Sequence, residues 1–165
     1  MAKNIILCGF MSCGKTTVGK KLADLIGYKF IDTDEMIIEL SGKSIKELFA
    51  EGGEELFRDM EHEVAKKLDS LEGYVISTGG GMMTFDRNID VINNGIVIYI
   101  DTPFNICYKR LLGTGRPIVS SKTRDEMIKM YNERISMYKK ASHYKVKNNN
   151  KPNETAKEIM EVMSL

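Results

Sequence analysis

The sequence predicts an α/β fold, in which a parallel β-sheet is covered by helices on both faces. Apolar segments of strand length alternate with longer segments of helical periodicity along the whole chain. This alternation favours right-handed crossovers between parallel strands. With 165 residues, no internal repeat and no long linker, we expect a single domain spanning residues 1–165.

The first strand, loop and helix carry the strongest functional motif. In residues 4–17, NIILCGFMSCGKTT, an apolar run is followed by a loop between two glycines, and residues 9–16 fit GxxxxGK[ST]. The glycines let successive backbone N–H groups point at one anion, and the helix that follows directs its positive end to the same place. Lys15 adds a charge for the outer phosphates, and Thr16 offers a hydroxyl to Mg²⁺. We therefore expect nucleotide phosphates to be bound by Ser12, Cys13, Gly14, Lys15, Thr16 and Thr17.

The first half of the remaining chain contains two further strands. Val18, Leu22, Leu25 and Ile26 share one face of the helix after the loop, and Gly27 ends it. The expected strands are 29–32 (KFID) and 74–77 (YVIS), and the expected helices are 36–40, 44–51 and 54–68. A capping box, Ser44 with Glu47, begins the second of these helices, and Gly52 with Gly53 separates it from the third.

The second half continues the alternation. Residues 96–101 (IVIYID) are typical of a buried parallel strand, and a short strand is expected at 144–146. Helices are expected at 86–94, 103–112, 123–141 and 154–164, with Thr102 as the cap of the second and a Thr123–Glu126 capping box at the third. Residues 113–122 (GTGRPIVSSK) lack apolar periodicity and predict a mobile loop.

Two carboxylates and three glycines are predicted beside the phosphate loop, because ligands bind beyond the carboxyl ends of parallel strands. Asp32 and Asp34 follow the second strand: one could bind Mg²⁺ through water, and the other could orient an acceptor hydroxyl and accept its proton. The alternative is that they cap the next helix. Asp101 is a competing candidate for the metal ligand, but we favour Asp32, because Thr102 and Pro103 already explain Asp101 as part of a helix start. Glycines 79–81 would let backbone N–H groups approach a ligand.

Three arginines are further candidates. Arg116, beside Pro117 in the glycine-rich loop, could reach a transferring phosphate. From helix patterning alone, Arg58 and Arg134 are expected on the surface, with Arg58 paired to Glu61.

The overall composition argues against several classes of protein. The net charge is +1 and no basic run interleaves with aromatic residues, so no nucleic-acid partner is expected. The longest apolar stretch, 96–100, is far too short for a membrane span, and no signal-peptide core is recognisable. We expect a cytoplasmic monomer that acts on a small molecule.

The motifs taken together resemble the shikimate kinase family. They are GFMSCGKTT, DTD at 32–34, FRDME at 57–61, GGG at 79–81, RP at 116–117 and ERISMY around Arg134, and they come in the family's order and spacing. The resemblance implies a three-layer P-loop fold with a five-stranded parallel sheet and a mobile lid at about 113–125. One departure is Ser12, where the family often has glycine.

The same resemblance implies an activity and a set of roles. It implies transfer of the γ-phosphoryl group of ATP to the 3-hydroxyl of shikimate, with Mg²⁺. Lys15, Asp34 and Arg116 would be catalytic, and Thr16 and Asp32 would lie near the metal. Shikimate would contact Asp34, Arg58, Gly79, Gly80, Gly81 and Arg134, with the two arginines holding its carboxylate. Arg110, Lys151 and Pro152 would lie near the adenine. The alternatives are a gluconate-type or nucleotide kinase on the same scaffold, and a nucleotide-binding module without transfer activity.

Overall fold

The chain folds around a five-stranded parallel sheet with the strand order β2-β3-β1-β4-β5. A computed structural model describes residues 3–115, 117–148 and 150–165, with only the backbone described at 117 and 118. The strands are β1 (Asn4–Cys8), β2 (Lys29–Asp32), β3 (Tyr74–Ser77), β4 (Gly95–Asp101) and β5 (Tyr144–Lys147). The predicted parallel sheet is therefore confirmed, and β1, with the phosphate loop at its end, is its central strand.

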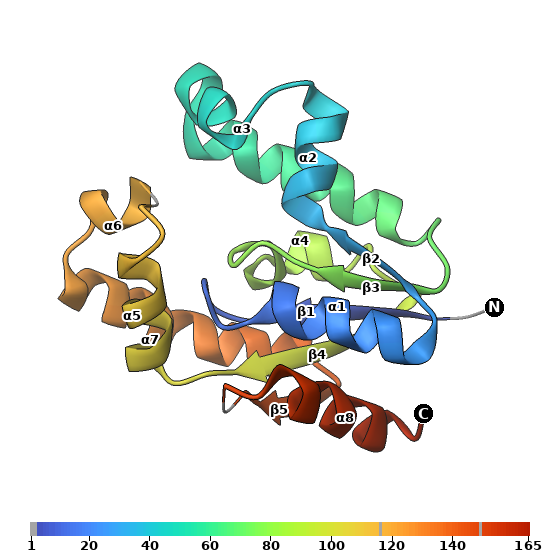
Figure 1. Ribbon diagram of the computed structural model, residues 1–165. Helices are drawn as coiled ribbons and strands as arrows, with labels where there is room; N and C mark the ends of the chain where they lie inside the picture. Colours follow the sequence, from blue (N-terminus) through green and yellow to red (C-terminus); the bar gives the residue numbers. More distant parts are fainter. Residues whose placement is uncertain (1–2, 116, 149) are drawn as a thin grey trace.

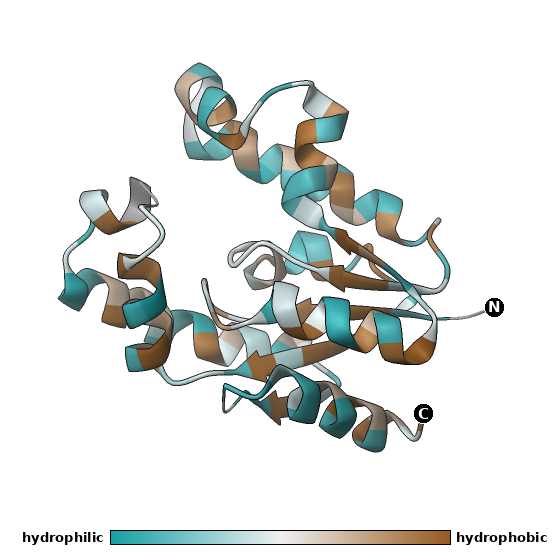
Figure 2. Ribbon diagram, in the orientation of Figure 1, coloured by the Kyte–Doolittle hydropathy of each residue, from teal (hydrophilic) through white to brown (hydrophobic). Residues whose placement is uncertain are grey.

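Helices cover both faces of this sheet (Figure 1). They are α1 (Lys15–Ile26), α2 (Thr33–Ser41), α3 (Ile45–Leu68), η1 (Met82–Thr84), α4 (Asp86–Ile89), α5 (Phe104–Leu112), α6 (Pro117–Ser121), α7 (Arg124–Ala141) and α8 (Pro152–Met163). In Figure 1, α1 and α8 lie in front of the strands, and α4 and α7 lie behind them. The strands consist mainly of hydrophobic residues, whereas hydrophobic and hydrophilic residues alternate along the helices (Figure 2).

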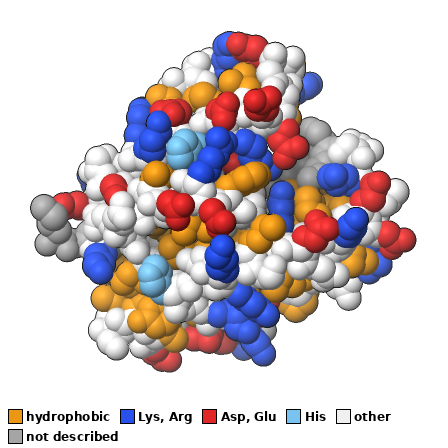
Figure 3. All heavy atoms as spheres, turned by 180° about the vertical axis from the view of Figure 1, so that it is seen from behind, with side chains coloured by type: hydrophobic (Ala, Val, Ile, Leu, Met, Phe, Trp, Pro, Cys, Tyr) orange, Lys and Arg blue, Asp and Glu red, His pale blue; other side chains and the backbone are white. Residues whose placement is uncertain are grey.

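The hydrophobic core is built around β1, which is buried on both faces of the sheet. Every residue of β1 is buried, and Ile6, Leu7 and Cys8 are fully inaccessible. Val18 and Leu22 of α1 pack into the same core from one side, and Val64 and Leu68 of α3 also join it. On the surface opposite the view of Figure 1, positive and negative side chains are interspersed (Figure 3).

Several element boundaries differ from the predictions. The break predicted at Gly52 and Gly53 is confirmed, since α3 consists of two helical parts that meet at a kink where Gly53 has non-helical angles (φ 67°, ψ −160°). Residues 117–121, predicted to be loop, form the short helix α6, and α4 ends at Ile89 instead of Asn94. A one-turn helix has too few positions for apolar periodicity to reveal it.

The start of α5 also differs from the prediction. Its first residue is Phe104 and its N-cap is Pro103, so Thr102 does not cap this helix. The Thr102 hydroxyl instead donates to the carbonyl of Cys13, at 2.8 Å. Within the described residues, no helix is long and apolar enough to cross a membrane.

A buried asparagine closes the end of the sheet remote from the phosphate loop. The Asn4 amide, fully buried, donates to the carbonyls of Leu68 and Leu71 at 3.1 and 2.7 Å, and its Oδ1 accepts from the Tyr74 N–H at 3.1 Å. It thereby joins the first strand to the end of α3 and the start of β3.

We expect Asn4→Ala to lower the free energy of unfolding by about 2–4 kcal/mol, because it leaves buried backbone groups without this partner. Urea unfolding followed by circular dichroism measures the change. Ser70→Ala is the control, since Ser70 is exposed and its hydroxyl also donates to a carbonyl at the end of α3. Equal losses for the two variants would contradict a special role for Asn4.

Candidate active site

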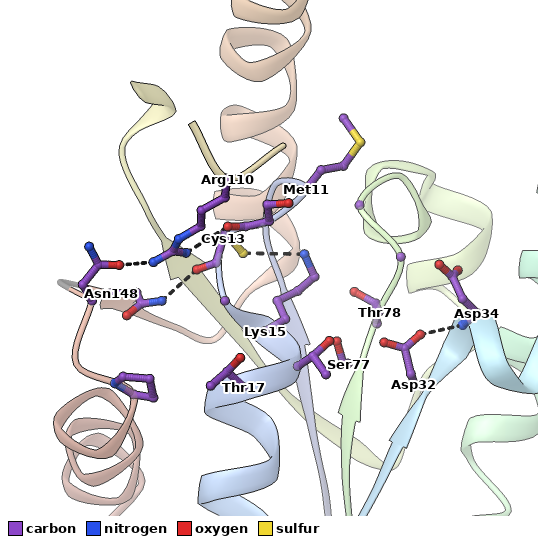
Figure 4. Close-up of a pocket in the computed structure, with 17 residues that line it drawn as sticks. Met11, Cys13, Lys15, Thr17, Asp32, Asp34, Ser77, Thr78, Arg110 and Asn148 are labelled. Atoms are coloured by element: carbon purple, nitrogen blue, oxygen red, sulfur yellow. Dashed lines mark hydrogen bonds between the residues drawn. The ribbon is translucent and has the colours of Figure 1, made fainter. Parts of the chain in front are cut away.

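A cavity of about 460 Å³ lies at the carboxyl ends of the strands, where the sequence placed the site. It is lined by Met11, Ser12, Cys13, Gly14, Lys15, Thr16, Thr17, Asp32, Asp34, Ser77, Thr78, Gly79, Gly80, Arg110, Asn148, Asn150 and Pro152. Figure 4 shows these side chains converging from the loop after β1, the ends of β2 and β3, helix α5 and the segment after β5. Residues far apart in the sequence thus share one pocket.

The N-terminus of α1 opens into this cavity without a competing side chain. Gly14 is its N-cap, no side chain caps it, and its first turn has no acidic residue. The unpaired N–H groups of a helix N-terminus and the positive end of its dipole favour an anion there. Gly14 has φ 103°, and a Cβ on it would lie 2.3 Å from the Asn148 amide nitrogen, so only glycine fits.

Lys15 is held beneath the loop and not exposed to solvent. Only 7% of the residue is accessible, and its Nζ donates to the carbonyls of Gly9 and Phe10 at 2.7 and 3.0 Å. Among the described residues, no ion pair joins Lys15 to a carboxylate. A buried ammonium group held by neutral carbonyls favours an incoming anion strongly.

The other carbonyls of the phosphate loop are also held by donors outside it. Arg110 of α5 donates to the Ser12 carbonyl at 2.9 Å, and Thr102 and Asn148 both donate to the Cys13 carbonyl at 2.8 Å (Figure 4 shows the contacts of Arg110 and Asn148). In a planar trans peptide, the carbonyl and the next N–H point in opposite directions. Turning the Cys13 carbonyl toward the protein therefore leaves the Gly14 N–H for phosphate, whereas the Cys13 N–H donates to the Phe10 carbonyl at 3.1 Å within the loop.

The two predicted carboxylates have different surroundings. Asp32 is the N-cap of α2, since its Oδ1 accepts from the Asp34 N–H at 2.8 Å. The capping alternative is thus correct for Asp32, but Asp32 also lines the cavity, and the cap uses one of its two oxygens. Asp34 lies in the first turn of α2 and lines the cavity beside the glycine segment. Asp101 is not among the residues that line it; its carboxylate accepts from Tyr99 and lies 3.9 Å from Lys145.

Arg58 is not the surface residue that helix patterning predicts. Its side chain is 15% exposed and donates to the buried Glu61 at 2.7 Å and to Glu54 at 3.3 Å. The guanidinium lies against the glycine segment, because a Cβ on Gly81 would be 2.3 Å from Arg58 Nη1. Gly81 and Arg58 thus lie next to the cavity without lining it.

Arg134 of α7 reaches the same segment from the opposite side. It is partly buried, and a Cβ on Gly80 would lie 3.4 Å from its Nη1. The surface interpretation from helix patterning is therefore wrong for both arginines. They converge on the two glycines because α3 and α7 pack on opposite sides of this turn, which is information absent from either helix alone.

Comparison with known proteins identifies the family. The shikimate kinase family model matches residues 11–164. A shikimate kinase of Clostridium botulinum is 39% identical over 99% of this chain and 98% of that protein. The chain belongs to the shikimate kinase family. The structure of a shikimate kinase from Acinetobacter baumannii in complex with shikimate has a TM-score of 0.89 at 32% identity, covering 99% of this chain and 94% of that one. The shikimate kinase of Aquifex aeolicus gives 0.81 at 36% identity, covering 98% and 96%.

Within the described chain, not every residue that the shikimate kinase resemblance assigns to a ligand lines the cavity. Arg58, Gly81 and Arg134 lie beside it, and Lys151 is also missing from its lining. Lys151 is exposed and pairs with Glu154 at 3.2 Å, whereas its neighbour Pro152 lines the cavity. Arg116 lies outside the described residues, so its role as a lid arginine stays a prediction.

The sequence analysis missed several residues of the site. Ser77, Thr78 and Asn148 line the cavity directly at the ends of β3 and β5, so their position after predicted strands was an available signal. Glu61 was recognised only as a surface partner of Arg58. In the fold it is 1% exposed, and its Oε1 has no hydrogen-bond partner within the described chain.

Burial raises the pKa of Glu61 above the usual value of a glutamate, and the nearby Arg58 only partly opposes this. The folded state therefore binds this proton more tightly than the unfolded state. Its contribution to stability is greatest at low pH and is lost as the pH rises from the unfolded pKa, about 4.5, through the folded pKa.

We therefore expect the free energy of unfolding of the parent, relative to Glu61→Gln, to fall as the pH rises above 4.5. Urea unfolding at a series of pH values measures this difference. Glu63→Gln is the control, because Glu63 is exposed and its pKa is lowered by Lys66, so its difference should not fall over that range. A constant difference for Glu61→Gln would show that the buried carboxyl titrates normally.

Proposed function

We propose that this chain transfers the γ-phosphoryl group of ATP to the 3-hydroxyl of shikimate and releases ADP. Family membership supports the reaction and disfavours a gluconate-type or nucleotide kinase. The observation that carries the proposal is the meeting of two different sites at one sheet edge. A cationic phosphate loop lies on one side, and two arginines with a carboxylate surround a glycine turn on the other.

The phosphate loop accounts for binding of the donor. The N–H groups at the start of α1 and the Lys15 ammonium neutralise the charge that spreads over the phosphate oxygens during transfer. When the Lys15 ammonium moves from the carbonyls of Gly9 and Phe10 to a phosphate, it exchanges two neutral partners for an anionic one. Arg110 and Pro152 line the cavity at its nucleotide end, where we place the adenine, and we also expect Lys151 near it.

The acceptor is held by the opposite wall. Arg58 and Arg134 would bind the carboxylate of shikimate, since guanidinium forms two parallel hydrogen bonds with a carboxylate. The Glu61 carboxylate accepts a hydrogen bond from the Arg58 guanidinium at 2.7 Å and so fixes its orientation. Asp34, in the wall between Arg58 and the loop, would orient the 3-hydroxyl and take its proton as the oxygen attacks. Arg116 would add positive charge at the transferring group.

The donor set near the loop fits Mg²⁺. The hydroxyl of Thr16 and the carboxylate of Asp32 line the same cavity, and hard oxygen ligands are those that Mg²⁺ prefers. No group of three or more His, Cys, Asp or Glu side chains in the described chain could hold a metal by itself. This suits an ion that arrives with the nucleotide and keeps several waters. When bound, it would neutralise charge on the phosphate oxygens.

We further propose that the protein acts in the cytoplasm as a monomer, without a nucleic-acid or membrane partner. The mixed charge on the face seen in Figure 3 supports the part of this proposal that concerns nucleic acid, because a polyanion favours a continuous basic surface.

The reaction is tested by measuring ADP release from ATP and Mg²⁺ with shikimate, gluconate, AMP or CMP as acceptor. We expect release only with shikimate, loss of release with EDTA and recovery with added Mg²⁺. Release with another acceptor instead would contradict the substrate. ATP binding without release for any acceptor would favour a binding module.

We expect Arg58→Ala to raise the KM for shikimate about 10- to 100-fold and to leave the KM for ATP within twofold. The loss of charge-assisted hydrogen bonds gives this magnitude. Arg87→Ala is the matched control, because Arg87 is exposed and pairs with Asp59, the neighbour of Arg58. A large loss of ATP affinity with unchanged shikimate affinity would show that Arg58 serves the nucleotide side of the site and would contradict its place at the acceptor.

A further inference from the structure

Helix α7 presents two tyrosines to the two loops that form the site. Tyr131, Arg134 and Tyr138 are spaced three and four residues apart, which places them on one face of the helix. The Tyr131 hydroxyl donates to the Thr102 carbonyl at 2.7 Å, and the Tyr138 hydroxyl donates to the Gly80 carbonyl at 2.5 Å. Both tyrosines are buried, with 8% and 1% of the residue exposed.

The first contact leads to the phosphate loop. Thr102 is itself buried, and its hydroxyl donates to the Cys13 carbonyl at 2.8 Å. One residue thus accepts from α7 through its backbone and donates to the loop through its side chain. The Cys107 thiol also points at the Thr102 carbonyl, but at 3.8 Å and as a weak donor. Tyr131 therefore fixes Thr102, and Thr102 in turn holds the Cys13 carbonyl away from the side of the loop on which phosphates would bind.

The second contact leads to the acceptor side. The Gly80–Gly81 peptide, whose carbonyl accepts from Tyr138, also lies against both arginines, since a Cβ on Gly81 would strike Arg58 and one on Gly80 would touch Arg134. Fixing the Gly80 carbonyl on α7 directs the Gly81 N–H to the opposite side of the same planar peptide. It also fixes the surface on which the Arg58 guanidinium rests.

We propose that Tyr131 and Tyr138 are positioning residues, through which α7 sets the nucleotide side and the acceptor side of the site independently. Tyr131 acts on ATP binding through Thr102 and Cys13, and Tyr138 acts on shikimate binding through Gly80 and Gly81. The assignment of the acceptor rests on the proposed function.

The chemistry of the two hydroxyls suits a permanent contact. Burial raises the pKa of Tyr131 to about 12 and also raises that of Tyr138 well above its usual value. Both groups therefore stay protonated, and remain donors, at any pH at which the enzyme works. Edge-on packing of Tyr131 against Phe10, at 5.1 Å between ring centroids, and the 5.5 Å contact of Tyr138 with Tyr99 hold the two rings in place.

The test compares Tyr131→Phe with Tyr138→Phe, which each remove one hydroxyl and leave the ring packing intact. We expect Tyr131→Phe to raise the KM for ATP and the Kd for ADP about fivefold, with the KM for shikimate within twofold. We expect Tyr138→Phe to raise the KM for shikimate about fivefold, with the KM for ATP and the Kd for ADP within twofold. Each variant is the matched control of the other, and urea unfolding measures the loss of stability that both share.

A second pair of variants tests the route through Thr102. Thr102→Val removes the hydroxyl at similar volume and should reproduce the nucleotide effect of Tyr131→Phe, whereas Thr102→Ser keeps the donor and should restore affinity. An effect of Thr102→Val without any effect of Tyr131→Phe would overturn the role of α7 on the nucleotide side.

The remaining outcomes separate this proposal from the proposed function. Equal losses of stability with unchanged KM values, or equal changes of both KM values in both variants, would overturn the positioning roles. Failure of the parent enzyme to phosphorylate shikimate would overturn the proposed function. In that case calorimetric titration with ADP still decides the Tyr131 half, because it needs no acceptor.

Discussion

The site depends on the orientation of a few peptide groups in the loop after β1. For their N–H groups to face an anion, their carbonyls must turn inward, where each requires a donor. Four side chains supply these donors: Lys15 at the start of α1, Arg110 in α5, Thr102 in the segment after β4 and Asn148 in the segment after β5. The loop is therefore shaped by the sheet, α5 and the segment after β5, and the glycines of its motif only permit that shape.

The sequence was sufficient for the sheet and the loop, because both are local signals. Alternating apolar and helical segments define the parallel sheet, and the glycine spacing defines the anion site. The family resemblance then placed Arg58 and Arg134 at the acceptor, whereas helix patterning alone placed them at the surface. An arginine followed three residues later by a glutamate has the same pattern on a solvated face and on a buried one.

Tertiary contacts explain the other differences. Thr102 has the sequence of a helix cap, with proline after it, but its hydroxyl donates to the Cys13 carbonyl in the loop after β1. The capping of α2 by Asp32 and its place at the cavity do not exclude each other, since one oxygen caps the helix and the carboxylate still lines the cavity. A backbone group that needs a partner is invisible until the chain is folded, so sequence motifs underestimate the number of residues that shape a site.

The central position of β1 has a consequence for synthesis of the chain. Ile5 pairs with Val75 on one side and with Ile96 on the other, so the first strand to leave the ribosome has no partner until β3 and β4 have followed it. Such non-local pairing is slow and leaves apolar surface exposed in the meantime. During synthesis the apolar side chains of β1 therefore stay uncovered until the segments that form β3 and β4 have been added, more than sixty residues later in the chain.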